Sequence, residues 1–285
     1  MSRRPLRGAL FGHGHMGAIH ARKLRERGVD VDIIDPPLGL TPSLTRQPDF
    51  AIVATPTPTH HAVAAPLLQA GVPCLVEKPL AHTLDAAAAL ARHNHLSVGH
   101  VERFNPALAP LRRIKPRFIE AERLAPFQRR GADVDVIADL MIHDLDLMLW
   151  MLGQPVTDLR AIGIGVMTDE IDIINARIEI GGAVATLTAS RVSHKTVRTL
   201  RVVDAGAYWS ADLRAKSLHR VDWGARDLTP QAVHVPDQDA IFEEQGAFLR
   251  AVRGEGPYPC TGSEALAAMA LAEKVRSSCS PDRRR

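Results

Sequence analysis

Short apolar runs alternate with helical patterns along the first hundred residues of the chain. The runs fit buried strands, and between them apolar positions recur at the spacing of one helix face. The expected strands are residues 6–11, 29–34, 51–54, 72–76 and 96–100, and the expected helices are residues 15–27, 62–70 and 84–92. Strands that alternate with helices in this way predict a parallel sheet flanked by helices.

Beyond about residue 110 the apolar positions change to a period of two, which is typical of strands with one buried face. The alternating segments are residues 118–124, 159–165, 173–180, 183–190, 197–203 and 207–212. Gly181-Gly182 between two of them predicts a hairpin turn. Helices are expected at residues 134–152, where Gly153 follows, and at residues 239–253 and 263–276. This half predicts a largely antiparallel sheet with helices against it.

The glycine-rich stretch Gly12-His13-Gly14-His15-Met16-Gly17 follows the first strand and precedes the first helix. In such a turn the first glycine permits a tight bend and the second lets the backbone approach a pyrophosphate. The third lets the helix pack closely, and the N–H groups of the helix N-terminus face the anion. A purely structural turn is the alternative that this motif alone leaves open.

Asp35 ends the second strand, 23 residues after Gly12. An acidic side chain at this distance meets the adenosine ribose hydroxyls of a bound dinucleotide. No Arg or Lys follows within the next ten residues to bind a 2′-phosphate, which favours NAD over NADP. Asp35 also suits the start of a turn. Residues 36–48 are few and rich in Pro, Thr and Leu, so an abbreviated crossover is expected there.

These patterns together predict an α/β protein of two domains. Residues 1–110 are expected to form a Rossmann-type dinucleotide-binding domain with a parallel sheet. Residues 111–285 are expected to form an α+β domain with a largely antiparallel sheet, for substrate binding and oligomerisation. The 285 residues, 46% hydrophobic and 24% charged, are enough for two globular cores.

Composition excludes several classes of function. No apolar run approaches the ~20 residues of a membrane span. The net charge of +3 is modest and aromatic residues make up only 4%, so we expect no nucleic-acid partner. Three cysteines without metal-ligand spacing indicate a reduced, cytoplasmic protein with no metal site.

Two loops lie at the carboxyl ends of expected strands, where ligands bind in open α/β sheets. One runs from Thr55-Pro56 to His60, and the other is Glu77-Lys78-Pro79. The Lys78 ammonium is a candidate for stabilising an alkoxide. An ordinary surface lysine is the alternative interpretation.

Asp139 and His143 are spaced i, i+4 on an expected helix, which places both side chains on one face. Asp139 is then able to orient the imidazole while His143 exchanges a proton near neutral pH. An ordinary helical hydrogen bond explains the same spacing. Asp144 and Asp146 lie close by, but no recognisable metal-ligand set accompanies them.

Four motifs occur together and in order: Gly12-x-Gly14-x-x-Gly17-x-x-His20, the loop at residues 54–60, Glu77-Lys78-Pro79 and Asp139-x-x-x-His143. Over essentially the whole chain this combination resembles the glucose–fructose oxidoreductase/inositol dehydrogenase (Gfo/Idh/MocA) family of NAD(P)-dependent enzymes. The resemblance implies that Lys78, Asp139 and His143 are catalytic and line the substrate pocket beside the nicotinamide. The residues expected to contact NAD are Gly12, Gly14, His15, Met16, Gly17, Asp35, Thr55, Pro56, His60, Glu77 and Lys78.

A closer likeness comes from residues 98–106, residues 139–146 and Arg123-x-x-Pro126-Phe127. They resemble a branch of the family that oxidises the 3-hydroxyl of UDP-N-acetylglucosamine ahead of a transaminase, in lipid A or surface polysaccharide biosynthesis. The resemblance implies a nucleotide-sugar substrate, for whose diphosphate an arginine fork is well suited. The residues expected to bind it are Lys78, Arg103, Asn105, Arg123 and His143.

Three other functions remain open from the sequence. They are a dehydrogenase of another sugar or of inositol, an NAD-dependent glycosidase of the same fold, and a non-catalytic NAD-binding sensor. Joint presence of Lys78, Asp139 and His143 disfavours the sensor. Because an antiparallel sheet rarely leaves its outer face bare, we expect a homodimer or homotetramer.

Overall fold

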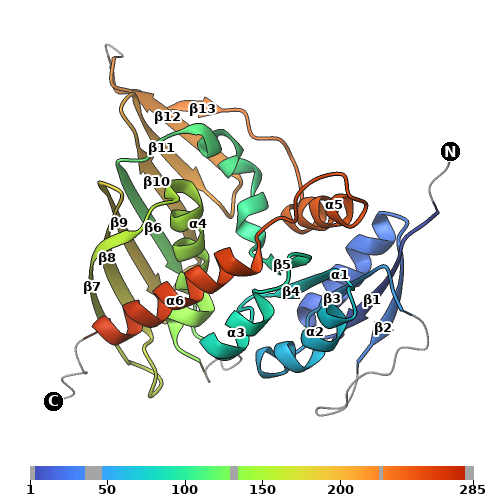
Figure 1. Cartoon of the computed structure of the whole chain (residues 1–285). Helices are drawn as coiled ribbons and strands as arrows, with labels where there is room; N and C mark the ends of the chain where they lie inside the picture. The colour runs from blue at the N-terminus through green and yellow to red at the C-terminus, as the bar shows by residue number, and fades with distance from the viewer. Residues whose placement is uncertain (1–3, 36–46, 129–133, 225–226, 280–285) are drawn as a thin grey trace. The chain divides into compact units, whose positions relative to one another are not determined.

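The computed structural model describes residues 4–35, 47–128, 134–224 and 227–279, and all structural statements concern these residues (Figure 1). Contacts divide the chain into two compact units. The first unit contains residues 1–104 and 239–267, and the second contains residues 105–238 and 268–285. Residues 36–46, where an abbreviated crossover is expected, lie outside the described residues.

The first unit is built on a five-stranded parallel sheet, as the sequence predicts, and its strand order is β2-β1-β3-β4-β5. Its strands are β1 (Arg7–Phe11), β2 (Asp30–Ile34), β3 (Phe50–Val53), β4 (Cys74–Glu77) and β5 (Leu96–Gly99). Its helices are α1 (His15–Glu26), α2 (His60–Gln69), α3 (Leu84–Leu90) and α5 (Ala240–Val252), with short 3-10 turns η1 (Thr57–Thr59) and η2 (Val101–Phe104). β3 is buried along its whole length, which explains its continuous apolar run.

Helix α5 belongs to the core of this first unit. Phe248 and Leu249 pack with Leu10 and Phe50, and the rings of Phe50 and Phe248 meet edge to face with centroids 5.9 Å apart. The sequence pattern assigns residues 239–267 to the second domain, whereas packing groups them with the first unit. An amphipathic helix pattern shows which face is buried but not which sheet buries it.

The second unit contains an eight-stranded sheet of order β13-β12-β11-β10-β6-β9-β8-β7. Its strands are β6 (Phe118–Leu124), β7 (Val156–Ile164), β8 (Ile173–Ile180), β9 (Ala183–Ser190), β10 (Val197–Val203), β11 (Ala207–Asp212), β12 (Ser217–Asp222) and β13 (Gln231–Val233). β6 pairs with β9 in parallel and the other neighbours pair antiparallel, which confirms the expected largely antiparallel sheet. Gly181 and Gly182 form the predicted β8–β9 hairpin, both with positive φ.

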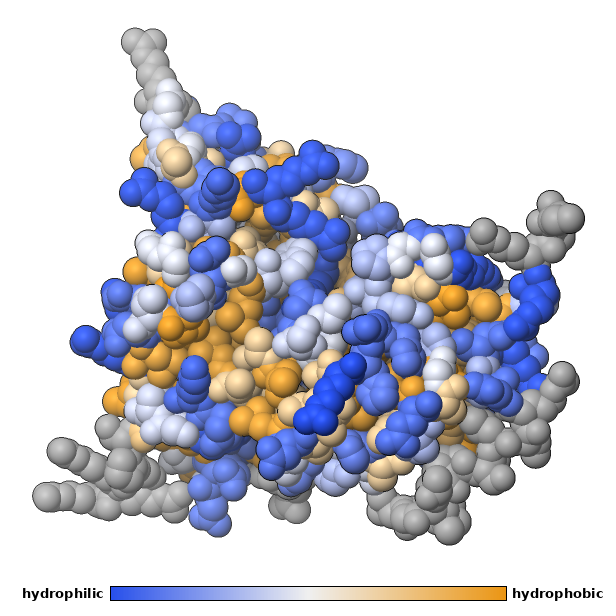
Figure 2. Space-filling model, in the orientation of Figure 1, coloured by the Kyte–Doolittle hydropathy of each residue, from blue (hydrophilic) through white to orange (hydrophobic). Residues whose placement is uncertain are grey.

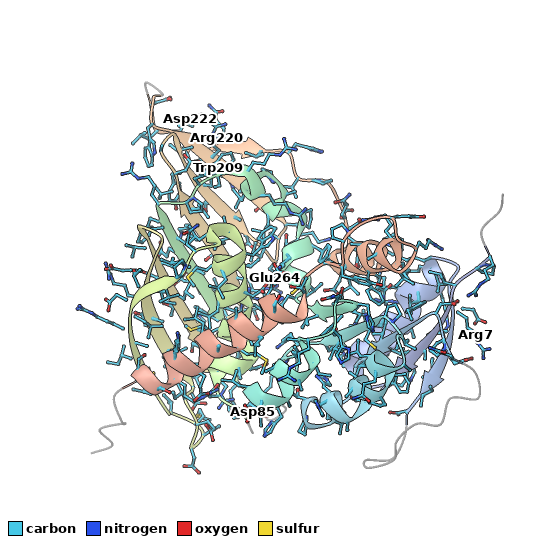
Figure 3. All side chains as sticks on the ribbon, viewed as in Figure 1. Arg7, Asp85, Trp209, Arg220, Asp222 and Glu264 are labelled. Atoms are coloured by element: carbon cyan, nitrogen blue, oxygen red, sulfur yellow. The ribbon has the colours of Figure 1, made fainter. Side chains whose placement is uncertain are left out.

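Strands β12 and β13 are absent from the sequence prediction. β13 is only three residues long, and β12 has apolar residues only at Leu218 and Val221, which breaks the period of two. Their pairing is supplied by neighbours: Trp209 on β11 lies opposite Arg220 on β12, with the guanidinium 4.9 Å from the ring centroid (Figure 3). The extra strands therefore depend on cross-strand contacts.

The helical elements of the second unit pack on the sheet through a large apolar cluster that includes Ile119, Leu145 and Ile178. They are η3 (Pro106–Arg113), η4 (Ile137–Met141), α4 (Ile142–Leu152) and the part of α6 (Gly262–Ser278) from residue 268 onward. α4 ends just before Gly153, where the sequence predicts its end, and the φ of +56° at Gly153 gives a left-handed cap.

The predicted single helix over residues 134–152 is wrong in its first half. Residues Ile137–Met141 are wound as a π-helix, η4, before the α-helix α4 begins. Such wide turns are rare and occur most often at functional sites. Here the turn carries Asp139, one of the expected catalytic residues.

The surface of the described residues mixes hydrophilic and hydrophobic atoms on the face seen in Figure 2. In the described part of the chain, no helix combines the length and the apolar character that a bilayer crossing requires.

Candidate functional site

The glycine-rich turn between β1 and α1 has the geometry that its sequence predicts. Gly12 has a φ of +88°, and a Cβ there would lie 2.6 Å from the Ala54 carbonyl oxygen. A Cβ on Gly17 would lie 2.0 Å from the Gly12 oxygen. Both positions therefore require glycine, the first for its backbone conformation and the second for close packing of α1.

The N-terminus of α1 is arranged to receive an anion. Gly14 is exposed, and a Cβ there would meet no atom of the described residues within 4 Å. Gly14 gives α1 no side-chain cap, and the first turn, which includes His15 and Met16, contains no acidic residue. The first N–H groups of the helix therefore fit the pyrophosphate of a dinucleotide.

Asp35 lies beside this turn at the end of β2. The His13 N–H lies 3.4 Å from Asp35 Oδ1, at the long limit for a hydrogen bond, and the Asp35 side chain is exposed. An exposed carboxylate next to the glycine turn is suited to the ribose hydroxyls of the dinucleotide. Its contact with the cofactor stays a prediction.

The loop after β3 is tied to the Lys78-Pro79 segment through His60. The buried His60 ring places Nε2 2.8 Å from the Thr55 carbonyl oxygen and Nδ1 3.0 Å from the Pro79 carbonyl oxygen. Burial lowers the pKa of His60 despite these contacts, and a neutral ring has a single N–H, which donates to only one of the two carbonyl oxygens at a time. His60 therefore lies packed between the two ligand-edge loops, and its own contact with NAD, like that of Thr55 and Pro56, stays a prediction.

Lys78 follows β4 directly and is half-buried. Its backbone N–H donates to Glu77 Oε2 at 3.2 Å, and Glu77 Oε1 lies 2.8 Å from His20 Nε2. Burial alone would raise the pKa of Glu77, but the His20 hydrogen bond and the Lys78 charge together lower it. Glu77 is therefore a carboxylate that fixes the backbone from which Lys78 extends.

Asp139 and His143 lie on consecutive turns in the second unit, Asp139 in η4 and His143 in the first turn of α4. Both side chains are half-buried. The i, i+4 spacing places two side chains on one face of a regular α-helix, and the π turn changes how Asp139 and His143 align. The proposed pairing of these residues stays a prediction.

The start of this helical segment is anchored by a buried carboxylate that the sequence analysis missed. Asp135 Oδ1 accepts the Ala138 N–H at 2.8 Å, and its other oxygen pairs with Arg276. Asp135 stands three residues before the N–H that it accepts, a helix-start signal that the sequence carries. The Arg276 partner, 141 residues away, has no such signal.

Comparisons with known proteins agree with this geometry. Residues 39–96 match a family model described as an oxidoreductase family with an NAD-binding Rossmann fold, and residues 116–206 match the GFO/IDH/MocA C-terminal domain. A UDP-N-acetylglucosamine 3-dehydrogenase of Acidithiobacillus ferrooxidans is 36% identical over 95% of this chain and 96% of its own. The chain belongs to the Gfo/Idh/MocA family.

Further Gfo/Idh/MocA proteins align along nearly the whole chain. The rhizopine catabolism protein MocA of Rhizobium meliloti is 25% identical over 96% of this chain and 95% of its own. A crystal form of the Acidithiobacillus ferrooxidans enzyme superposes with a TM-score of 0.88 at 35% identity, covering 97% of this chain and 98% of that one. The chain is thus an oxidoreductase with the NAD-binding fold of this family, as the four motifs predict.

The side chains expected to bind substrate have partners inside their own units. Arg103, on η2, donates to Glu264 at 2.8 Å, and Glu264 also accepts the Thr261 N–H at the start of α6 (Figure 3). Asn105 donates to the Leu213 carbonyl oxygen and accepts the Ala107 N–H. These contacts shape the segment that follows β5.

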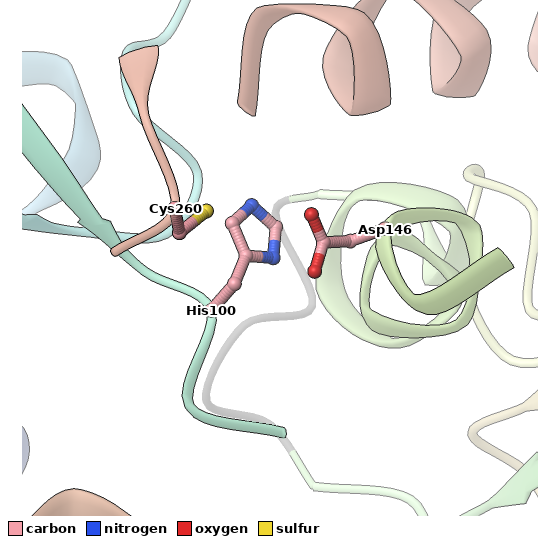
Figure 4. Close-up of side chains that lie close together, drawn as sticks. All are labelled: His100, Asp146 and Cys260. Atoms are coloured by element: carbon pink, nitrogen blue, oxygen red, sulfur yellow. The ribbon is translucent and has the colours of Figure 1, made fainter. Parts of the chain in front are cut away.

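The beginning of that segment, at the end of β5, is also held by a hydrogen bond to Cys260, in the same unit. Val98 on β5 donates its N–H to the Cys260 carbonyl oxygen at 2.9 Å. Figure 4 shows the Cys260 side chain beside the His100 ring, where β5 ends, and both residues are buried. The segment that resembles the UDP-sugar branch is therefore held by packing as well as by hydrogen bonds.

Arg123 forms a buried bidentate ion pair with Asp144, at 3.0 Å from Nε and 2.8 Å from Nη2, and the two side chains are 3% and 4% exposed. The pair joins β6 to α4, next to His143. Substrate binding by Arg123 stays a prediction. Asp144, weighed from sequence as a metal ligand, has an arginine partner instead.

Replacing Arg123 with methionine is expected to lower the free energy of unfolding by about 3–5 kcal/mol, because a buried carboxylate at Asp144 loses its partner. The double replacement with Asp144→Leu is expected to cost less than the single one. Urea unfolding measures both. The control is Arg177→Met, which breaks the exposed pair with Glu179 and is expected to cost about 0–1 kcal/mol. Equal losses for Arg123→Met and Arg177→Met contradict the prediction.

Proposed function

We propose that this protein oxidises the 3-hydroxyl of UDP-N-acetylglucosamine to a ketone with NAD as the hydride acceptor. The observation that carries the proposal is the 36% identity to a UDP-N-acetylglucosamine 3-dehydrogenase over nearly the full length of both chains. The ketone then serves a transaminase that makes a 3-amino sugar, for lipid A or surface polysaccharide biosynthesis in the cytoplasm.

The cofactor part of the proposal rests on the first unit. Gly12, Gly14 and Gly17 bring the N-terminus of α1 to the pyrophosphate, with His15 and Met16 in its first turn. Asp35 binds the adenosine ribose and selects NAD. When bound, NAD supplies a nicotinamide C4 that accepts the hydride. Thr55, Pro56, His60 and Glu77 shape the ligand-facing edge of the sheet.

The chemical step assigns one role to each of three side chains. His143 takes the proton of the sugar hydroxyl, and bound NAD would accept the hydride from the same carbon. Asp139 orients the imidazole and stabilises its protonated form. The Lys78 ammonium stabilises the developing alkoxide. The products are a ketone, NADH and one proton, so atoms and electrons balance.

Arg103, Asn105 and Arg123 are proposed to hold the nucleotide sugar. An arginine donates two hydrogen bonds to a phosphate at once, and Asn105 offers an amide for a sugar or base edge. Exchange of Glu264 or Asp144 for a substrate phosphate would keep each guanidinium paired with an anion throughout.

The proposed assembly is a homodimer or homotetramer formed through the sheet of the second unit. Exposed apolar side chains gather at and after the edge strand β7, at Ile162, Ile164, Val166 and Met167. An edge strand with exposed apolar residues is an aggregation hazard unless something covers it. A second copy of the chain is the proposed cover.

A panel of UDP-sugars and free sugars with NAD, followed by NADH absorbance, tests the proposal. NADH is expected to form with UDP-N-acetylglucosamine, at a kcat/KM at least about tenfold above that for other UDP-sugars or inositol. Mass spectrometry of the product should show the loss of two hydrogens. Release of free sugar without NADH, or preference for inositol, contradicts the assignment.

A further inference from the structure

Two consecutive polar residues of α5, Glu244 and Gln245, are buried in the first unit at 1% and 0% exposure. α5 packs against α1 and η2. A buried glutamate is costly unless it is paired, hydrogen-bonded or neutral. His20, which stands in the glycine motif and has no role in the proposed chemistry, is also fully buried. These side chains therefore need a structural explanation.

Gln245 fixes the proton position on His20. Its Nε2 lies 3.2 Å from the His20 carbonyl oxygen, which only accepts, so this atom is the amide donor. The same Nε2 lies 2.9 Å from His20 Nδ1, which must then accept. The His20 proton is left on Nε2, where it donates to Glu77 Oε1 at 2.8 Å. The chain of donors runs from α5 through α1 to β4.

This series of hydrogen bonds ends at Glu77, the residue directly before Lys78. Its second oxygen accepts the Lys78 backbone N–H at 3.2 Å. A Cβ on Gly99 of β5 would lie 3.1 Å from the Glu77 carboxyl, so glycine at this position leaves the carboxylate its space. Glu77 is thus held by hydrogen bonds from His20 on α1 and from the Lys78 backbone.

Glu244 differs from Glu77, because neither of its side-chain oxygens has a hydrogen-bond partner among the described residues. Burial, and to a smaller extent the negative charge of Glu77, raise the pKa of Glu244 well above its usual range. Two buried carboxyls that interact cannot both be ionised cheaply. Glu77 has the donors, so Glu77 keeps the charge and Glu244 keeps a proton.

Several other charged groups near this stretch of α5 already form ion pairs. The titratable groups on the packed elements are His15, His20, Arg22, Lys23, Arg25 and Glu26 on α1, Arg27 directly after α1, Glu77 at the end of β4, and Glu102 and Arg103 on η2. Lys23 pairs with Glu26 and Asp239, and Arg103 pairs with Glu264. Glu77 is accordingly the charge that acts on Glu244.

We propose that Gln245, His20, Glu77 and a protonated Glu244 form a buried positioning network for Lys78. The network holds Glu77 as a single charged carboxylate and so fixes the backbone that aims the Lys78 ammonium. His20 and Gln245 are positioning residues, since they act through Glu77, and a neutral Glu244 leaves Glu77 as the charged member of the two carboxyls. The role of Lys78 in turnover rests on the proposed function, whereas the network itself does not.

The first test is the pH dependence of stability for Glu244→Gln. In the unfolded chain Glu244 ionises at an ordinary carboxyl pKa, but in the folded chain its pKa is raised. Wild type therefore binds more protons when folded, and it loses stability as pH rises above about 4.5. Glu244→Gln lacks this loss, so its Tm is expected to rise relative to wild type between about pH 5 and about pH 8.

Glu243→Gln is the matched control, because it makes the same change one residue earlier on α5 at a less buried position. Its Tm is expected to run parallel to that of wild type across the same pH range. If the Tm of Glu244→Gln also runs parallel to that of wild type over this pH range, the proposal that Glu244 is protonated in the folded chain is overturned. This readout needs no substrate, so it stands apart from any failure of the proposed function.

The second test compares His20→Leu with His20→Gln. The glutamine retains an N–H donor for Glu77, and leucine does not. His20→Leu is expected to lower kcat about 10- to 100-fold with little change in the KM for NAD, and His20→Gln is expected to recover most of it. A merely structural role predicts equal losses in the two variants, which would overturn the positioning role.

Nitrogen NMR of the histidine rings gives a reading of the same network without turnover. In wild type at about pH 7.5 the His20 ring is expected to carry its proton on Nε2, with the signals assigned by their absence in His20→Gln. A proton on Nδ1 would overturn the network. If no sugar reduces NAD while this tautomer is found, the proposed function fails and the network stands.

Discussion

Replacement of His143 by alanine is expected to lower kcat for the UDP-sugar by about 10²–10⁴, with the affinity for NAD nearly unchanged. His143 is the proposed acceptor of the hydroxyl proton, and a positioned base contributes about this much to a proton transfer. The residue lies at the start of α4, in the second unit, whereas the glycine turn lies in the first. Stopped-flow NADH formation and NAD titration by fluorescence measure the two quantities.

His194→Ala is the matched control, since His194 is an exposed histidine of the same unit. It is expected to retain wild-type kcat. The rate of wild type is expected to fall on the acid side as the base becomes protonated, and this acid limb should vanish in His143→Ala. Near-normal turnover in His143→Ala, or an unchanged acid limb, contradicts the proposed base.

Replacement of Lys78 by methionine is expected to lower kcat by about 10²–10³, because the charge that stabilises the alkoxide is removed while the length of the side chain is kept. Lys78→Arg keeps the charge but changes its geometry, and it is expected to recover only part of the loss. Steady-state rates with saturating NAD measure the effect.

Lys115→Met provides the comparison for this variant. Lys115 is also followed by a proline, and it is exposed. It is expected to retain full turnover. A Lys78→Met enzyme as fast as Lys115→Met would remove Lys78 from the mechanism, and His143 would then have to act without an electrostatic partner.

The proposed positioning network links the expected effect of Lys78→Met to buried residues of the first unit. If Lys78 acts from a fixed backbone, then His20→Leu lowers kcat for the same reason as Lys78→Met, but by less. The double variant is expected to be little slower than Lys78→Met alone, because residues that act through one another are not additive.

Local patterns predicted much of the fold. β8, β9, β10 and β11 begin and end at the expected residues, because a strand with one buried face alternates strictly. The glycine turn was predictable for a similar reason. The close contacts of Gly12 and Gly17 with neighbouring backbone exclude any side chain, and the sequence displays this exclusion directly.

Contacts between residues far apart in the sequence could not be predicted from local patterns. Asp135 starts the helix of Asp139 and His143, but its Arg276 partner lies 141 residues further along the chain. Arg123 was given a substrate-binding role from sequence and Asp144 none, and the structure pairs them with each other. A charged residue in a sequence shows its chemistry but not its partner.

The sequence by itself determined most of the strands and helices, that a parallel sheet carries a nucleotide-binding turn, and that the chain has the motifs of an NAD-dependent oxidoreductase. Tertiary structure alone decided that α5 returns to the first sheet, that η4 is wound as a π-helix, and that Gln245 orients His20 across 225 residues. The division has a physical cause. Periodicity and turn chemistry are short-range properties of the chain, whereas burial partners, and the protonation states that depend on them, exist only after distant segments have packed together.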